Sequence, residues 1–385
     1  MKRDKEIELL GESLTLMRER RRPATAEEAL VPVSDYTDPA RFERELACVF
    51  RRELNVVALS TDVAGPGDFV RADVLGAPAL VVRGTDGQLR AFLNVCRHRG
   101  ATVELRPAGR CERFVCPYHA WTYDTDGALR RARHPEGFPT LVAAEHGLVE
   151  LPCVERAGLV FVCPTPGAAP PALPSECADE LTHVLGLRPT AYASYSRVVA
   201  ANWKLIVEGG IESYHFSVAH KDTIAPFFTD TSSTWERIGA HTRQVLPKRS
   251  LQELDAIPSE RWRIRDHTHI VYSLHPNAMV LLQKSHFDLI LMTPLAVDST
   301  RITVLSVGVG QEDPALATKA KQFMQRNHEF TVLTLEEDFV LGEQIQRGIA
   351  TGANTHFRFG GYEGALTDFR RHLEAELARS SDAPG

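Results

Sequence analysis

Two segments near the N-terminus show the spacing of amphipathic helices, with apolar residues recurring every three and four positions over 5–22 and 40–53. Over residues 55–165 the pattern changes to short β-type runs separated by turns. Asp-Gly pairs at 86–87 and 126–127 each lie between two such runs, which is typical of β-hairpins. This part of the chain is therefore predicted to form a small all-β domain.

The second half of the chain mixes strand and helix patterns without regular alternation. Residues 163–176 are rich in proline, and we interpret them as a linker at a domain boundary. Residues 277–310 contain three β-rich runs, as in an antiparallel sheet, and 315–348 and 363–379 have the periodicity of long helices. Strands followed by a long helix indicate an α+β domain.

Composition and charge narrow the class of protein. Apolar residues make up 43% of the 385 positions, and the formal net charge of −6 argues against a nucleic-acid-binding surface. The first residues, MKRDKEIELL, lack the apolar core of a signal peptide, and polar side chains interrupt the most apolar stretch, 278–297. We therefore expect a cytoplasmic protein with no membrane span and no nucleic-acid partner.

Two short-spaced pairs of metal-ligand residues lie in the β-type region. Cys96-x-His98 is followed after 17 residues by Cys116-x2-His119. Zinc sites usually pair like residues, whereas here each loop supplies one thiolate and one imidazole. Mixed pairs suit a binuclear cluster in which thiolates bind one iron and imidazoles the other, the Rieske 2Fe-2S arrangement. The plain alternative is two polar loops with buried cysteines.

A second group of ligand-type residues lies in NWKLIVEGGIESYHFSVAH, residues 202–220. If this stretch is helical, Glu208, Glu212 and His215 fall at i, i+4 and i+7 and share one face. His220 lies five positions after His215, so the helix must end or bulge before both rings can reach one metal. Two imidazoles and a carboxylate from elsewhere would form the facial triad of non-haem Fe(II) oxygenases, with a buried core histidine as the alternative.

Candidates for the missing carboxylate lie in LEEDFVLGEQIQRG, where Glu336, Glu337 and Asp338 are consecutive. Neighbouring helical residues point about 100° apart, so only one of the three can face a buried metal. The periodicity does not choose among them.

Together these residues resemble the catalytic alpha subunit of Rieske non-haem iron oxygenases, the aromatic ring-hydroxylating oxygenase family. The likeness runs from YTDPARFERELACVFRR through GDFVRADVLGAPALVVRGTDGQLRAFLNVCRHRG and CPYHAWTYDTDG to the C-terminal helix. It implies an α+β fold with an N-terminal all-β Rieske domain at 41–165 and a helix-grip catalytic domain with an antiparallel sheet at 166–385. Residues 1–40 would form a helical segment that packs on the catalytic domain.

The resemblance also assigns metal ligands residue by residue. The ligands of the 2Fe-2S cluster would be Cys96, His98, Cys116 and His119. Two ligands of the mononuclear iron would be His215 and His220. The family's E-D-x4-E-x2-Q pattern, which runs here from Glu337 to Gln346, selects Asp338 as the third.

Two positions depart from the commoner family residues. Glu212 stands where many members have an Asp that bridges the two metal sites across a subunit boundary, and we assign it that bridging role. In having a Glu at this position, the chain is similar to a minority of the family, which includes members that act on quaternary ammonium substrates. Gly209 occupies a position where Asn is common.

The function implied by the resemblance is that of a terminal oxygenase, an oxidoreductase that adds oxygen from O2 to a small, aromatic organic substrate by hydroxylation or dihydroxylation. Electrons would come from NAD(P)H through a separate reductase, with or without a ferredoxin, and the oxygenase would be a homotrimer. The alternatives within the family are an oxidative N- or O-demethylase and a quaternary-ammonium monooxygenase. The alternative from another class is a Rieske electron carrier without catalysis, and the second ligand set argues against it.

Aromatic side chains are candidates for lining an apolar substrate pocket or a cation cage. For each of them, burial in the core is the alternative. They are Phe227, Phe228, Trp235, Trp262, Tyr272 and Phe287.

Overall fold

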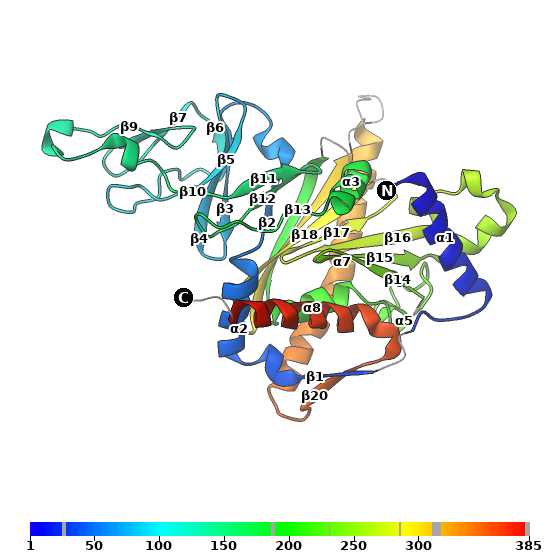
Figure 1. Ribbon diagram of the computed structural model, residues 1–385. Coiled ribbons are helices and arrows are strands. Elements are labelled where there is room, and N and C mark those ends of the chain that lie inside the picture. Colours follow the sequence, from blue (N-terminus) through cyan, green and yellow to red (C-terminus); the bar gives the residue numbers. More distant parts are fainter. Residues whose placement is uncertain (25–27, 186–188, 231, 285, 310–316, 382–385) are drawn as a thin grey trace. The chain divides into compact units, whose positions relative to one another are not determined.

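The computed structural model describes all residues except 25–27, 186–188, 231, 285, 310–316 and 382–385. The chain divides into two compact units, and elements of both are labelled in Figure 1. The smaller unit contains residues 50–172 and 187–189, and the larger unit contains 1–49, 173–186 and 190–385. The domain limits that the sequence predicted, near residues 40 and 165, are not tested by this division into compact units and stay predictions.

The smaller unit is built from short antiparallel strands. They are β2 (Asn55–Leu59), β3 (Asp68–Val74), β4 (Ala77–Arg83), β5 (Leu89–Leu93), β6 (Ala108–Arg110), β7 (Arg113–Val115), β8 (Thr122–Asp124), β9 (Leu129–Arg131), β10 (Glu150–Leu151), β11 (Cys153–Arg156) and β12 (Leu159–Val162). They form sheets in the orders β10-β5-β4-β3-β6, β11-β12-β2 and β7-β8-β9. Both Asp-Gly hairpins are confirmed, since β4 pairs with β5 and β8 with β9.

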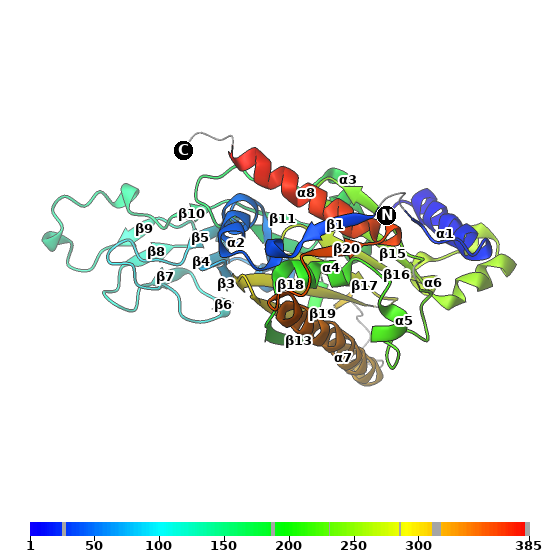
Figure 2. The same cartoon turned by 90° about the horizontal axis from the view of Figure 1, so that it is seen from below.

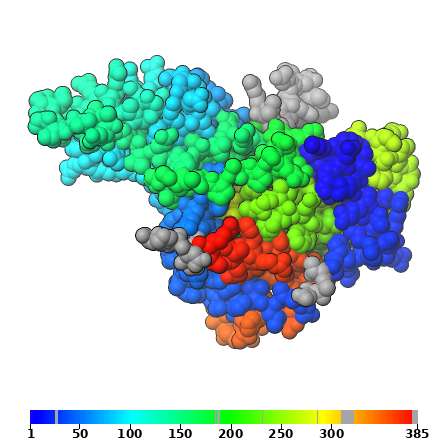
Figure 3. All heavy atoms as spheres, in the orientation of Figure 1, coloured from blue at the N-terminus to red at the C-terminus, as the bar shows by residue number. Residues whose placement is uncertain are grey.

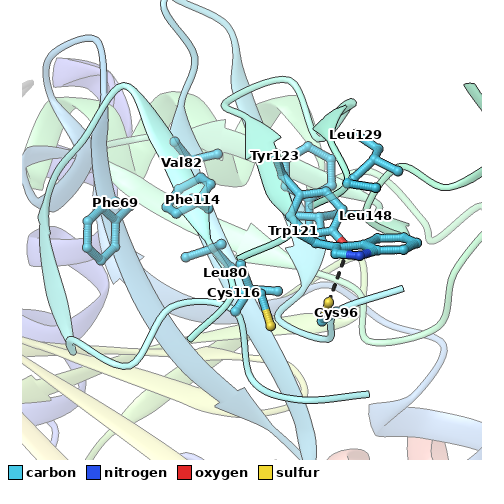
Figure 4. Close-up of a cluster of buried hydrophobic side chains, with 13 residues drawn as sticks. Phe69, Leu80, Val82, Cys96, Phe114, Cys116, Trp121, Tyr123, Leu129 and Leu148 are labelled. Atoms are coloured by element: carbon cyan, nitrogen blue, oxygen red, sulfur yellow. Dashed lines mark hydrogen bonds between the residues drawn. The ribbon is translucent and has the colours of Figure 1, made fainter. Parts of the chain in front are cut away.

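One buried cluster of the smaller unit connects its sheets to its cysteines (Figure 4). Phe69, Leu80 and Phe114 lie in this cluster together with Cys96 and Cys116. Alternate residues of β4 belong to this cluster and to a second buried cluster, so this sheet is buried on both of its faces. The two loops that begin at Cys96 and Cys116 are therefore anchored in a hydrophobic core.

The larger unit combines helices with a second sheet. Its elements are α1 (Arg3–Arg18), β1 (Ala29–Pro32), α2 (Pro39–Glu45), α3 (Ser175–Leu185), β13 (Pro189–Val199), α4 (Trp203–Gly210), α5 (Phe216–Ala219), β14 (Thr234–Ile238), β15 (His241–Pro247), α6 (Ile264–His267), β16 (Thr268–Leu274), β17 (Ala278–Leu282), β18 (His286–Ala296), β19 (Ser299–Val309), α7 (Ala317–Ile349), β20 (His356–Phe359) and α8 (Gly364–Ser381). The seven-stranded sheet has the order β13-β19-β18-β17-β16-β15-β14.

The predicted α+β class is confirmed in this unit. The three β-rich runs become the antiparallel strands β17, β18 and β19, apart from residues 285 and 310, which lie outside the described residues. The two long C-terminal helices are α7 and α8, and the first residues of the predicted 315–348 helix also lie outside that part. Within the described residues, no helix is both long and apolar enough to cross a bilayer.

Helix α4 lies where long-range packing converges. It contacts α7 and strand β18, and α7 also contacts β19. Strands β1 and β20, far apart in sequence, pair antiparallel and run side by side in Figures 1 and 2. The segments that carry the second group of ligand residues, 202–220 and α7, are thus held against each other and against the sheet.

The prediction that Glu208, Glu212 and His215 share one helical face is wrong. Helix α4 ends at Gly210, and a separate short helix, α5, begins at Phe216. A β-carbon on Gly210 would approach the methyl carbon of Met279 to 2.2 Å, so glycine permits close packing on β17. The break re-aims the chain between Glu208 and His215.

Candidate metal centres and cavities

Two loops of matching conformation carry the cysteine and histidine pairs of the smaller unit. In the first, Cys96 N–H donates to Ala101 O at 2.8 Å and Gly100 N–H donates to Cys96 O at 2.9 Å. In the second, Cys116 N–H donates to Trp121 O at 2.9 Å, and a further bond returns to Cys116 O at 3.0 Å. The two loops thus close through the same pair of backbone hydrogen bonds around their cysteines.

The four side chains of these loops offer the donor set of a binuclear cluster. The rings of His98 and His119 lie 4.6 Å apart between centroids, and each has a buried Nδ1 without a hydrogen-bond partner among the described residues. Burial raises the pKa of the Cys116 thiol, and the neighbouring Cys96 thiol adds to this increase. Buried polar atoms are normally satisfied, so two orphaned ring nitrogens beside two thiols fit a bound 2Fe-2S group.

Aromatic side chains surround these loops. The ring of Trp121 stacks on that of His98 with 4.9 Å between centroids and 10° between planes. Tyr123 Oη lies 3.3 Å from Cys96 Sγ, drawn as the dashed line in Figure 4, and accepts a bond from Arg97 N–H at 3.0 Å. A hydroxyl that accepts from the backbone is free to donate to a thiolate sulfur, which stabilises its negative charge.

In the larger unit, two imidazoles and one carboxylate converge. His215 Nε2 and His220 Nε2 lie 3.1 Å apart. Asp338 Oδ1 lies 2.9 Å from the Nε2 of His220 and 3.4 Å from that of His215. We call these three residues the first triad. Two imidazole nitrogens and one carboxylate oxygen within this range are the donor set of a facial triad.

The other ring nitrogen of each triad histidine binds a carboxylate. His215 Nδ1 is hydrogen-bonded to Glu212, and His220 Nδ1 lies 2.7 Å from Glu337 Oε2. Thr223 Oγ1 donates to the same Glu337 oxygen at 2.7 Å. Carboxylates at the distal nitrogen fix the tautomer and direct Nε2 at a metal. Of the three consecutive acids, Asp338 thus faces the imidazoles, Glu337 supports His220, and Glu336 turns to Arg197.

The local charges favour a cation between the two rings. Burial opposes protonation of His215, but Asp338 and Glu212 outweigh it and raise its pKa to about 10. Burial also opposes protonation of His220, and Asp338 again raises that pKa. Burial alone would raise the pKa of Asp338, yet the two imidazoles hold it below its usual value. A site that stabilises positive charge on two rings suits a metal ion in the same place.

Buried polar contacts hold α4 in position. Asn202 caps α4 by accepting from Lys204 N–H at 3.0 Å, and its own N–H donates to Gln346 Oε1 on α7 at 2.9 Å. Trp203 Nε1 donates to Glu45 at 2.9 Å, and the fully buried Lys204 ammonium donates to the same carboxylate at 2.8 Å. This anchoring explains the NWK sequence before the ligand histidines.

Two cavities meet the first triad. One, of about 350 Å³, is lined by His215, Asp338 and Glu212 among mostly apolar residues of α4, β17 and α7. The other, of about 340 Å³, is lined by His220 and Asp338 and by an aromatic wall. We call the latter the aromatic cavity. Its phenylalanines are Phe216, Phe227, Phe228 and Phe330. The first triad is therefore open to small molecules.

The predicted pocket-lining aromatics divide between cavity and core. Phe227 and Phe228 line the aromatic cavity, which agrees with the expectation that they line a substrate pocket. Tyr272 and Phe287 are fully buried and line neither cavity, which agrees with the alternative of core packing. Trp262 donates to Ile257 O at 2.8 Å and likewise lines neither. Trp235 lies on β14 outside both linings.

Two family models match this chain. Residues 187–379 match the ring hydroxylating alpha subunit (catalytic domain), and residues 53–144 match the Rieske [2Fe-2S] domain. The chain belongs to the ring-hydroxylating alpha-subunit family. The resemblance seen in the sequence is confirmed, as is the order of an N-terminal Rieske domain and a C-terminal catalytic domain.

Curated relatives of this alpha subunit act on different substrates. The chain is 35% identical over 207 residues to the carnitine monooxygenase oxygenase subunit of Escherichia coli K12, covering 52% of this chain and 53% of that protein. It is 32% identical over 205 residues to the terephthalate 1,2-dioxygenase terminal oxygenase component subunit alpha 2 of Comamonas sp, covering 49% and 48%. The matches thus span about half the length of these relatives.

Solved structures show the same fold over most of the chain. A quaternary ammonium Rieske monooxygenase matches with a TM-score of 0.75 and 26% identity, covering 90% of this chain and 95% of that one. Naphthalene 1,2-dioxygenase from Rhodococcus sp. matches with a TM-score of 0.75 and 18% identity, covering 98% and 99%.

Several residues of this alpha subunit's site escaped the sequence reasoning. Glu45 and Tyr36 come from the N-terminal segment, where Tyr36 Oη donates to the buried Glu208 at 2.8 Å. Lys248 and His269 line the aromatic cavity from separate elements. Only the YTDPARFERE stretch carried a signal, as part of the family resemblance, and no spacing rule connects the others to the site.

Proposed function

We propose that this chain is the terminal oxygenase component of a Rieske-type non-haem iron oxygenase, which uses O2 and reductase-derived electrons to hydroxylate or dihydroxylate a small organic substrate. The observation that carries the proposal is the convergence of His215, His220 and Asp338, with 2.9 to 3.4 Å between ligand atoms, beside two cavities. A chain that also contains a Rieske domain has a source of single electrons for such a site.

In this proposal Cys96, His98, Cys116 and His119 hold the cluster, and the first triad holds one iron(II). When bound, the two groups supply electron transfer and activation of O2. The protein's part is placement and exclusion of water. Glu212 and Glu337 orient the two imidazoles, and the phenylalanines of the aromatic cavity keep the reacting face dry.

We assign Glu212 a second task as the link between a cluster and an iron on neighbouring subunits of a homotrimer. It already binds His215 Nδ1 and accepts from Tyr214 N–H, and a carboxylate has further lone pairs for an imidazole of another subunit. Electrons would come from NAD(P)H through a cytoplasmic reductase, with or without a ferredoxin. The trimer and these partners rest on family membership.

The aromatic cavity is the proposed substrate site because it contains polar groups that lack partners. Buried His269 Nε2 has no hydrogen bond among the described residues. The Lys248 ammonium has no carboxylate hydrogen-bonded to it there, only the charges of Asp266 and Lys284 nearby, and burial lowers its pKa. Unsatisfied groups at a cavity wall are normally completed by a ligand or water.

The substrate we infer is a carboxylate with an apolar or quaternary-ammonium end. Among the described lining residues, Asp338 is the sole acid, and Lys248 supplies a positive charge. The Arg265 guanidinium donates to the backbone carbonyl oxygens of Gln283 and His286, which line the same cavity. A substrate carboxylate near Lys248 would place its other end against the phenylalanines. That end is an aromatic ring or a methylated ammonium, since aromatic faces bind both.

A substrate screen tests this function. Holoenzyme with a surrogate reductase is assayed for stimulated O2 uptake with benzoate, benzamide, glycine betaine and choline, and product masses are recorded. We expect uptake with a carboxylate of either type and little with the uncharged or purely cationic analogue. Product mass separates one added oxygen, two, or loss of a methyl group, the last being the demethylase alternative.

Lys248→Met sharpens the screen. Loss of the charge is expected to raise KM for the carboxylate substrate about tenfold or more, with a smaller effect on kcat. Lys284→Met, which changes an exposed lysine near the same region, is the matched control. An unchanged KM in Lys248→Met would refute the carboxylate assignment but leave the oxygenase proposal standing.

Iron content separates the oxygenase from a Rieske electron carrier. A carrier would hold only the two irons of its cluster, whereas the oxygenase would hold about three per chain. A brown protein without the additional iron, and without substrate-stimulated O2 uptake for any compound, would overturn the proposed function.

A further inference from the structure

A second group of two imidazoles and one carboxylate lies elsewhere in the larger unit. His275 is in the turn between β16 and β17, and His372 and Glu376 lie one helical turn apart on α8. His275 Nε2 is 2.9 Å from Glu376 Oε2, and His372 Nε2 is 3.2 Å from Glu376 Oε1. The three potential ligand atoms all lie within 4.8 Å of one another. We call these residues the second triad.

These distances suit a small divalent ion. Zinc bonds of about 2.0–2.2 Å in tetrahedral geometry place neighbouring ligand atoms about 3.3 Å apart. The two nitrogen–oxygen separations, 2.9 and 3.2 Å, run to different oxygens of Glu376, so the carboxylate would turn to present one oxygen to the ion. His372 Nε2 is buried and makes no well-formed hydrogen bond among the described residues, despite the nearby oxygen. A metal would satisfy this nitrogen.

A third histidine supports the arrangement without joining it. His241 Nδ1 accepts from the backbone N–H of His275 at 3.1 Å, so a neutral His241 carries its proton on Nε2 and has no free lone pair for a metal. His241 therefore positions His275.

The surroundings of the second triad are closed. The side chains of His275 and Glu376 are 5% and 7% exposed, and that of His372 is 19% exposed. None of the three lines a cavity of the first triad. Helix α8, red in Figure 3, forms part of the surface, and the 19% exposure of the His372 side chain marks the side of the triad that is nearest to solvent. Three protein ligands leave one of the four tetrahedral positions of zinc to a water molecule, and separation from both cavities gives a substrate no access to it.

We propose that His275, His372 and Glu376 form a structural zinc site that fastens α8 to the β16–β17 turn. Imidazole and carboxylate ligands suit zinc(II), which needs no redox partner. The site is separate from the oxygenase chemistry and stands whether or not that proposal holds. A metal-free arrangement, with both imidazoles simply hydrogen-bonded to Glu376, is the competing outcome.

Zinc retention tests the proposal directly. Iron-replete holoenzyme is incubated with zinc, desalted and analysed for metals in the wild type and in His372→Ala, Glu376→Gln, His215→Ala and His356→Ala, the last an exposed histidine of the same unit. We expect about one zinc per chain in the wild type, His356→Ala and His215→Ala, as for a single tetrahedral site. His372→Ala and Glu376→Gln should lose the zinc and keep their iron.

A stability measurement covers the case in which a variant folds poorly. Zinc should raise the Tm of His215→Ala, where the first triad cannot hold it, by preferential binding to the folded chain. The double variant His215→Ala/Glu376→Gln should show no such rise. Wild-type protein without retained zinc, or zinc lost with His215→Ala but kept with His372→Ala, would overturn the proposal.

Discussion

The first and second triads offer nearly the same ligand atoms in different surroundings. The first lies between α4, α5 and α7 and borders cavities of about 350 and 340 Å³. The second lies between a β-turn and α8 and lines neither cavity. In the first, each imidazole has its own outer carboxylate, whereas in the second one glutamate serves both rings.

This difference teaches that a donor set alone does not define a catalytic site. Structural metal sites are closed, and catalytic sites keep a position open for substrate. The two triads differ in whether a cavity reaches them and in whether separate carboxylates hold their imidazoles, but they do not differ in residue type. Replacing one ligand in either triad should therefore change different properties of the protein.

The largest expected effect is on turnover. Asp338→Ala removes a proposed iron ligand and should lower the rate more than about 100-fold while the cluster colour remains, since the two metal sites use separate ligands. Glu376→Ala should leave turnover per folded protein within about twofold, because its triad lines neither of the two cavities that meet the first triad. Single-turnover product yield and visible absorbance measure both. Equal losses in the two variants would contradict the division into open and closed triads.

A smaller effect is expected from the outer carboxylate of the open triad. Glu337→Gln weakens the support of His220 Nδ1 and should lower iron affinity about 10- to 100-fold, with activity recovering in excess iron. Its neighbour Glu336, which pairs with Arg197 instead, provides the control Glu336→Gln. Iron titration of the stripped protein distinguishes them. The interpretation fails if both variants bind iron like the wild type.

The smallest expected effect contrasts buried carboxyls near the two triads. Burial raises the pKa of Glu208 to about 7 from 4.5, against the effects of Arg370 and the Tyr36 hydroxyl. Burial would also raise the pKa of Glu376, but its two imidazoles hold that pKa far below normal. The folded state thus binds an extra proton at Glu208 between pH 4.5 and 7, so this residue makes stability fall as pH rises through that interval.

Glu208→Gln should remove that pH dependence. Relative to the wild type, the variant should gain about 3 kcal/mol of unfolding free energy between pH 4.5 and 7.5, because glutamine stays neutral. Urea unfolding at several pH values measures the difference, with the exposed Glu253→Gln as the control. A constant offset between variant and wild type at all pH values would mean that Glu208 does not hold the extra proton.

Sequence patterns predicted the regular parts of this molecule well. The Asp-Gly hairpins and the strands of 277–310 were readable because alternation and turn chemistry are local properties. The helix break after Gly210 was missed because Glu208, Glu212 and His215 happen to match helical spacing, and that spacing was given more weight than the glycine pair at 209–210.

The candidate sites were only partly predictable. Short-spaced pairs such as Cys96-x-His98 can be recognised directly in the sequence. The family pattern selected Asp338, which periodicity alone did not. His275 and Glu376 are 101 positions apart, and Lys204 and Glu45 are 159 apart. Contacts of this kind arise from tertiary packing, and the spacing of residues within a short segment carries no information about them.

Gly209 has a consequence for how this protein can change over evolutionary time. It borders both cavities of the first triad, and a β-carbon built on it meets no atom within 4 Å. A larger residue there would therefore reduce the space available to a substrate while leaving the imidazoles and their carboxylates untouched. Substrate size and metal binding are thereby separable traits, so selection at this one position is able to retune the first without endangering the second.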